Sequence, residues 1–410
     1  MGKLKKILLI EPFVPYPLNN GGAQAIFNGI LAIKSRYRVY ILFAQQEPEE
    51  RLQAFRAAVG GDITILPTPT PPPLPLSLKH RIALSLYYRT GSDRLRPKDF
   101  FEDKMVEPVM SECFQEGVCR MIDQYHIDIV QVEMPWLMSA VLFLPDKVRK
   151  VFVHHELRFV RNGLELQTCG ESIYRRTAVA LNEILEIGIL NRYDAIITLS
   201  PVDREKLLAH GVTTPVFSSY AIVGSSPEVE PIKEVRKVVS FVGPEFHLPN
   251  QKGLEWFLSE CWDELRERYS DFELQIIGNW SEATRQRTVA RYPGVRFLGF
   301  VDCLRDALRD TVMIVPITIG SGIRMKILEA AANGIPFVST SVGAEGLPFV
   351  SGQECYIADS AAAFVKDIMR LQDCAQANAF VRAAHQRVVS QFSLAALSQD
   401  RCRILREVCP

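Results

Sequence analysis

Short, mostly apolar stretches of strand length alternate with helix-length segments along almost the whole chain. The predicted strands form two series: residues 5–10, 39–43, 127–133, 148–154 and 193–199, and then residues 238–242, 273–277, 295–298, 314–317, 337–338 and 356–358. Parallel strands that are buried on both faces have this near-continuous apolar character, and a crossover helix connects each to the next. Among the helix-length segments, residues 165–191 and residues 252–269 are each predicted to form one helix. The alternation therefore predicts an α/β fold with parallel sheets covered by helices.

The two series are separated by a polar, proline-bearing stretch, residues 223–236, which we interpret as a linker. A chain of 410 residues has room for two or three domains. We therefore expect a first doubly wound domain over residues 1–222 and a second over residues 237–390. Residues 391–410 are predicted to form a C-terminal helix that packs back on the first domain. Two such domains in tandem place the default ligand site in the cleft between them.

Charge and cysteine usage exclude several classes of protein. Lys+Arg and Asp+Glu both number 47, so the zero formal net charge gives no general attraction to nucleic acid. The nine cysteines include no C-x-x-C pair, which argues against a zinc site and against a secreted disulfide scaffold. The apolar run at residues 7–10 is too short for a signal peptide, and no run reaches the length of a membrane span. A cytoplasmic location is expected.

One unit, residues 314–347, combines a strand, a glycine-rich turn, a helix and a second strand before residues 343–346 turn away. The predicted helix covers residues 323–333, with Gly334 just beyond its end. Ser321 is of a type that suits the N-cap, so the free N–H groups after it would face an anion. Arg324 and Lys326 add positive charge at the same place.

Further along this helix, Lys326, Glu329 and Asn333 share one face because they are spaced three and seven residues apart. The unit could therefore hold a ligand with phosphates at one end and hydroxyls at the other. The alternative is an ordinary βαβ crossover with a solvated face of Glu and Lys side chains. The residues of this unit alone favour the ligand site only slightly.

Residues 67–75 contain six prolines and are predicted to form an irregular loop. The stretch that follows begins at Leu76, ends at Lys98 and holds six Lys or Arg residues against one acidic residue. Such a basic amphipathic segment could bind an anionic membrane surface, or it could be a surface helix packed on its own domain.

Residues 320–347, GSGIRMKILEAAANGIPFVSTSVGAEGL, resemble the nucleotide-sugar site of glycosyltransferase family 4. The resemblance also covers the first strand with Gly21 and Gly22, the turn that holds His154, His155 and Glu156, and residues 194–200. It continues through the motifs FVGPEF, LQIIGNW and VRFLGFVD in the expected order. It implies the GT-B architecture, in which two Rossmann-like domains face a cleft.

The resemblance also implies roles for individual residues. Glu329 matches the glutamate that contacts the ribose hydroxyls, whereas Ser321 stands where a first glutamate, eight positions earlier, usually contacts the donor sugar. Arg324 and Lys326 match a diphosphate clamp, to which Lys252 is a further candidate. His155 matches a histidine near the donor sugar, although from the sequence alone a histidine at a strand end is more often bonded to the backbone. The remaining implied donor contacts are Gly21, Gly22, Gly243, Gly278, Phe300, Val301, Gly322, Gly343, Ala344 and Glu345.

The implied function is a retaining glycosyltransferase that moves a sugar from a nucleoside-diphosphate sugar to a glycan, a lipid-linked acceptor or another hydroxyl group. The enzyme is expected to act in the assembly of a bacterial surface polysaccharide or glycoconjugate. No metal or other cofactor is expected, because the chain has no Asp-x-Asp motif and its cations can replace a metal. Two alternatives remain: a nucleotide-sugar epimerase of the same architecture, and a non-catalytic subunit that binds nucleotide sugar or glycan.

Overall fold

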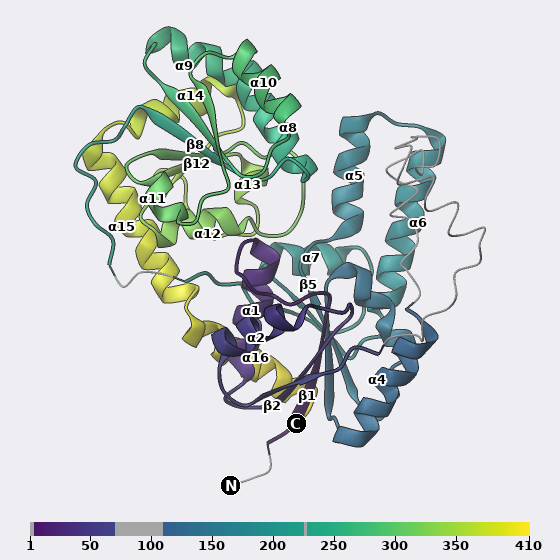
Figure 1. The fold of residues 1–410 in the computed structure, drawn as a ribbon. Helices are drawn as coiled ribbons and strands as arrows, with labels where there is room; N and C mark the ends of the chain where they lie inside the picture. The colour runs from purple at the N-terminus through teal and green to yellow at the C-terminus, as the bar shows by residue number, and fades with distance from the viewer. Residues whose placement is uncertain (1–3, 70–109, 225–227) are drawn as a thin grey trace.

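The computed structural model describes residues 4–69, 110–224 and 228–410. These residues form two parallel α/β units, each a twisted sheet with helices on both faces (Figure 1). The predicted fold class is therefore confirmed. The basic stretch from Leu76 to Lys98 lies outside the described residues, so its membrane role stays a prediction. No helix among the described residues is long and apolar enough to span a membrane.

The first sheet has the strand order β3-β2-β1-β4-β5-β6-β7, and all its neighbouring strands are parallel. Its strands are β1 (Lys6–Glu11), β2 (Arg38–Phe43), β3 (Ile63–Leu66), β4 (Ile129–Glu133), β5 (Arg149–His154), β6 (Ala195–Thr198) and β7 (Val216–Ser218). Its helices are α1 (Gly21–Ile33), α2 (Glu49–Val59), α4 (Glu112–Tyr125), η3 (Pro135–Leu142), α5 (Arg158–Cys169), α6 (Ile173–Leu190) and α7 (Pro201–Ala209). The order reverses between β1 and β4.

The second sheet has the order β10-β9-β8-β11-β12-β13, again parallel throughout. Its strands are β8 (Val238–Val242), β9 (Glu273–Ile277), β10 (Val295–Gly299), β11 (Val312–Val315), β12 (Phe337–Ser339) and β13 (Tyr356–Ile357). Its helices are α8 (Leu248–Trp256), η4 (Phe257–Cys261), α9 (Trp262–Arg268), α10 (Glu282–Arg291), α11 (Leu304–Leu308), α12 (Met325–Ala332), α13 (Ser341–Ala344) and α14 (Ala361–Arg370). This order reverses between β8 and β11.

The chain returns to the first unit at its C-terminal end. Helix α15 (Cys374–Gln391) leads away from the second unit, and α16 (Leu394–Val408) lies beside α1 (Figure 1). The hydroxyl of Ser398 donates to the carbonyl of Ala32 at 2.6 Å, and Ile404 and Leu405 are fully buried there. One apolar core runs through both units, since it includes Ile30 of α1 and Ile327 of α12.

Three predicted segments differ in the structure. The single helix expected over residues 165–191 is two helices, because Gly170 has a φ of 85° and Ser172 caps a new helix by accepting from the N–H of Arg175. Residues 252–269 are interrupted by the π-helical turn η4. The turn expected at residues 343–346 is partly helical, since Thr340 caps α13 by accepting from the N–H of Gly343.

Candidate active site

The carboxyl ends of β8 and β11 flank the point where the second sheet reverses, which is where doubly wound sheets bind ligands. Helix α12 follows β11 at this edge. The predicted N-cap is wrong: α12 begins at Met325 with Arg324 as its N-cap residue, and no side chain caps it. Gly320 and Gly322 have φ values of 131° and 75°, so the chain cannot become helical at Ser321.

Ser321 instead contacts the first unit. Its hydroxyl is buried and donates to the carbonyl of Leu157 at 3.1 Å. A Cβ on Gly322 would lie 2.6 Å from the carbonyl oxygen of His155, so a side chain at that position would force the two units apart. The glycine-rich turn before α12 therefore serves as a tight contact between the units.

Arg324 is a buried cation with unused donors. Its Nη1 donates to the carbonyl of Ser321 at 2.5 Å and to that of Gly322. Its Nε and Nη2 have no hydrogen-bond partner within the described part of the chain. Burial lowers the pKa of Arg324, and the nearby carboxylates of Glu156, Glu345 and Asp203 oppose that shift. A buried guanidinium with two unpartnered nitrogens, which together carry three N–H bonds, is suited to an oxyanion, which would satisfy both its charge and its donors.

Lys326 is the second residue of α12 and is half-buried. Its ammonium donates to the carbonyl of Val242, the last residue of β8, and to Oδ1 of Asn250 at 2.9 Å. It also lies 5.1 Å from the centre of the Phe241 ring. Burial, together with the charge of Arg324, lowers the pKa of Lys326 to about 7. Two cations that disfavour each other's charge in this way would both be stabilised by a bound anion.

Glu329 lies one turn further along α12. Its Oε1 accepts from the side-chain amide of Gln24, on α1, at 2.5 Å. Burial raises the pKa of Glu329, while Gln24 and Lys326 act in the opposite direction. The structure thus brings the predicted residues Arg324, Lys326 and Glu329 together on one helix and adds a partner from the first unit.

Lys252, the further candidate for the diphosphate clamp, forms an ion pair on its own helix, α8. Its ammonium pairs with Glu255 at 2.9 Å at a partly exposed position on α8. Asn250, two residues earlier, is the residue of this helix that contacts Lys326. Sequence reasoning missed Asn250, because its contact with Lys326 joins segments 76 residues apart and depends on how they pack.

The first residues of helix α1 lie close in space to the first residues of helix α12. Asn20 caps α1 by accepting from the N–H of Ala23 at 2.9 Å, so Gly21 and Gly22 form its first turn. A Cβ on Gly21 would lie 2.8 Å from Cγ of Met325. The two predicted glycines therefore lie at the junction of the units, where α12 lies next to α1 (Figure 1).

The two adjacent histidines at the end of β5 have different environments. Nε2 of His155 lies 2.7 Å from Oε2 of Glu133, whose other oxygen accepts from Gln131 at 2.7 Å. A carboxylate can only accept, so Nε2 of His155 carries a proton and Nδ1 is left to another group. His154 is fully buried against Glu186, which also accepts from two N–H groups at the start of α5. Glu186 thus holds one ring nitrogen of His154, while Nδ1 has no partner among the described residues, and His155 stays the main candidate of the two.

The other predicted donor contacts line the same edge of the second sheet or its neighbouring loops. Gly243 has a φ of 155°, and a Cβ there would lie 2.5 Å from the amide of Asn250; Gly278 packs equally closely on the Gly243 carbonyl. Phe300 is 61% exposed and Val301 half-buried. Gly343 and Ala344 are buried in α13, and the next residue, Glu345, pairs with Lys206 of α7 at 2.6 Å.

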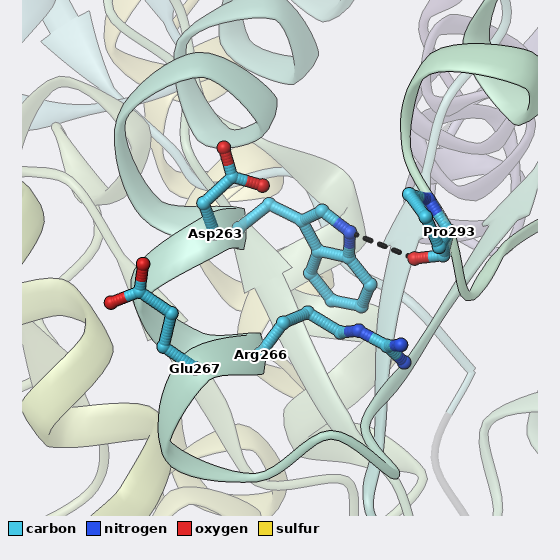
Figure 2. Close-up of a pocket in the computed structure, with 5 residues that line it drawn as sticks. Asp263, Arg266, Glu267 and Pro293 are labelled. Carbon is cyan, nitrogen blue, oxygen red and sulfur yellow. Dashed lines mark hydrogen bonds between the residues drawn. The ribbon is translucent and has the colours of Figure 1, made fainter.

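A surface pocket of about 340 Å³ lies elsewhere, on α9 (Figure 2). Its polar groups are used within the protein: the indole N–H of Trp262 donates to the carbonyl of Pro293 at 3.2 Å, and Arg266 donates to that of Phe272 at 2.8 Å. The orphaned buried donors that mark the α12 region are absent from the residues that line this pocket. We therefore place the candidate site at α12.

The sequence of this chain matches a family model and one curated relative, each over part of its length. Residues 236–373 match the family model described as "Glycosyl transferases group 1". A curated relative from Klebsiella pneumoniae, "Uncharacterized 44.6 kDa protein in cps region", is 29% identical over 140 residues. That match covers 32% of this chain and 36% of the relative, so it spans about a third of either protein.

Solved structures resemble the chain over its whole length. TarM superposes with a TM-score of 0.71 at 10% identity, covering 100% of this chain and 99% of that one. Sucrose-phosphate synthase from Thermosynechococcus elongatus gives 0.69 at 17% identity, with coverage of 98% and 99%. Anabaena HepE in complex with UDP gives 0.66 at 13% identity, with coverage of 98% and 100%. The chain therefore has the GT-B fold of two Rossmann-like units, and its second unit matches a glycosyltransferase domain.

Proposed function

We propose that this protein is a retaining glycosyltransferase that takes its sugar from a nucleoside-diphosphate sugar. The observation that carries the proposal is Arg324, a buried guanidinium with two unpartnered nitrogens next to the Lys326 ammonium. Both lie at the start of α12, where the sheet order reverses, so a diphosphate there would meet two cations and the free N–H groups of a helix. The match of residues 236–373 to a glycosyltransferase model supports this reading.

In this proposal the chemistry is mainly electrostatic. Negative charge grows on the nucleoside diphosphate as the bond to the sugar breaks, and fixed positive groups stabilise that charge without having to reorganise. Arg324 and Lys326 take this role, and Glu329 accepts hydrogen bonds from the ribose hydroxyls. The departing phosphate assists attack by the acceptor on the same face of the sugar, which retains its configuration, and His155 lies near that sugar.

The nature of the acceptor is the less constrained part of the proposal. We propose a glycan, a lipid-linked acceptor or another hydroxyl group in the assembly of a bacterial surface polysaccharide, supported by the relative from a cps region. A cytoplasmic enzyme that binds the anionic inner face of the membrane through Leu76 to Lys98 would suit such an acceptor. No metal is assigned a role, because Arg324 and Lys326 supply positive charge at the place where the diphosphate would bind.

A thermal-shift screen of nucleoside diphosphates and nucleotide sugars directly tests the part of the proposal that concerns binding of the sugar donor. A ligand at 100 times its Kd stabilises the folded state by about 2.7 kcal/mol, which is readily seen as a higher Tm. A chain that responds to none of them would contradict the proposal and favour a non-catalytic subunit. Incubating the best donor alone then separates the classes, because an epimerase converts it without an acceptor and a transferase needs one.

A further inference from the structure

Asn250 connects the loop after β8 with the head of Lys326. It lies in the first turn of α8 and is 3% exposed. Its Oδ1 accepts from the Lys326 ammonium at 2.9 Å, and its Nδ2 donates to the carbonyl of Pro244 at 3.0 Å. Its backbone N–H donates to the carbonyl of His247 at 2.9 Å. Both ends of one buried side-chain amide are therefore used.

The orientation of this amide follows from the chemistry of its partners. An ammonium group can only donate and a carbonyl can only accept, so the oxygen of Asn250 must face Lys326 and its nitrogen must face Pro244. A carboxylate of the same shape would lose the bond to the Pro244 carbonyl and place two oxygens against each other. The position therefore calls for an amide and not merely for a polar residue of this size.

Two of the N–H donors of Lys326 hold its ammonium group in position, and the third is available to a ligand. An ammonium group has three N–H bonds. One goes to the Val242 carbonyl and one to Asn250, and the third makes no hydrogen bond within the described residues, although the Phe241 ring lies 5.1 Å from the ammonium. A strand end and a buried amide thus hold the charged head at the carboxyl edge of the sheet, with one donor left for a ligand.

The backbone beside Asn250 is shaped to fit it. Gly243 has a φ of 155°, and a Cβ built on it would lie 2.5 Å from Cγ and Nδ2 of Asn250. The loop therefore packs directly on the amide, and the indole of Trp280 donates to the Gly243 carbonyl at 2.8 Å. This packing leaves the amide little freedom to rotate away from Lys326.

We propose that Asn250 is a positioning residue that holds the Lys326 ammonium against the diphosphate of a bound nucleotide. The inference rests on the proposed function in one respect, that a nucleoside diphosphate binds at α12. A neutral amide also leaves the ammonium its full charge for the ligand, whereas an aspartate would cancel it. Because burial lowers the pKa of Lys326 to about 7, a neutral acceptor that favours the charged form is of use here.

The test compares affinities for UDP and for uridine, which lacks the diphosphate. UDP is titrated by calorimetry, and uridine is measured by competition against it. For Asn250→Ala we expect UDP to bind about tenfold more weakly while uridine is unchanged. Asn378→Ala is the matched control, because Asn378 is a half-buried amide of the same unit that also bonds backbone groups, those of Ile232. For Asn378→Ala, the ratio of the UDP affinity to the uridine affinity should equal that of the wild type.

A double-mutant cycle shows whether Asn250 acts through Lys326. In a Lys326→Met background, Asn250→Ala should cause no further loss of UDP affinity. A separate further loss, or equal losses for UDP and uridine, would assign Asn250 a structural role and overturn the inference. If Asn250→Ala does not fold, Asn250→Leu, which keeps the shape of the side chain and adds no charge, gives the same comparison of UDP with uridine.

Failure of the underlying function gives a different result. If the wild type does not bind UDP, then ADP, GDP and dTDP are titrated in turn, each with its nucleoside as the reference. A wild type that binds none of them contradicts the proposed function, and the inference falls with it. A wild type that binds one of them while Asn250→Ala keeps the same selectivity for the diphosphate contradicts the inference alone.

Discussion

The side-chain amide of Gln24, on the first unit, donates to Oε1 of Glu329, on the second, at 2.5 Å. The carboxylate proposed to bind the ribose is thus the one that the opposite unit contacts. For Gln24→Ala we expect the transfer rate to fall about tenfold, equivalent to about 1.4 kcal/mol, while nucleoside diphosphate affinity changes less. The reason is that, in the proposed function, the second unit holds the nucleotide, whereas transfer would need both units around the donor and the acceptor.

Steady-state kinetics and calorimetry on the same preparations would check this split. Gln53→Ala is a suitable control, since Gln53 lies exposed on α2 of the same unit. An equal loss in rate and affinity would mean that Gln24 belongs to the nucleotide site itself. Unchanged rate and affinity would mean that the contact has no role in transfer.

The spacing of residues along one helix predicted the centre of this candidate site. The contacts that distant segments of the chain make with it could not be predicted from the sequence. Arg324, Lys326 and Glu329 could be read together because neighbouring turns of one helix fix their positions. Asn250 and Gln24 reach them from 76 and 305 residues away along the chain, through the packing of loops and of the two units. Nothing in the residue pattern encodes that packing.

The fold shows the same division. Long apolar runs such as β1 and β4 were predicted, whereas β3 and β7, the two edge strands of the first sheet, were missed, because they are only partly buried and lack a long apolar run. The break between α5 and α6 was missed because Gly170 and Ser172 interrupt two amphipathic stretches that read as one. The shift of the α12 N-cap from Ser321 to Arg324 depends on glycine dihedral angles, which composition alone does not specify.

Lys326 should make the stability of the protein depend on pH. Its pKa is about 7 in the folded protein and near 10.5 when exposed, so between these values the unfolded chain binds more protons. The free energy of unfolding of the wild type should therefore rise with pH from about 7 to about 10, relative to Lys326→Met. Urea denaturation of both proteins at half-unit pH steps would measure the difference, and a difference that is flat or falls over this range would contradict the assignment.

Arg324 should determine diphosphate affinity. Arg324→Gln removes the guanidinium with its two unpartnered nitrogens and its charge, and charge-assisted hydrogen bonds contribute about 1.5–3 kcal/mol. We expect nucleoside diphosphates to bind roughly tenfold to a hundredfold more weakly, measured by calorimetry. Arg287→Gln, an exposed arginine on α10, is the control. Equal affinities for Arg324→Gln and the wild type would remove Arg324 from the clamp.

Glu329 should confer selectivity for ribose. If its carboxylate accepts from the ribose hydroxyls, the wild type will bind a nucleoside diphosphate more tightly than its 2′-deoxy form. Glu329→Ala should bind both equally, because the acceptor is gone. Competition binding with the matched pair of nucleotides measures this ratio. A variant that keeps the preference of the wild type would show that another group recognises the ribose.

His155 should affect transfer without affecting nucleotide binding. Its Nε2 is held by Glu133 at 2.7 Å, so the ring is fixed at the end of β5 beside the Gly322 turn. For His155→Ala we expect transfer to fall at least about a hundredfold, the lower range for a positioned histidine, with nucleoside diphosphate affinity within a factor of two or so. His210→Ala is the matched control, since His210 makes a comparable 2.7 Å pair with Glu183 at the surface. Normal transfer by His155→Ala would reduce the His155–Glu133 pair to a structural contact between β5 and β4.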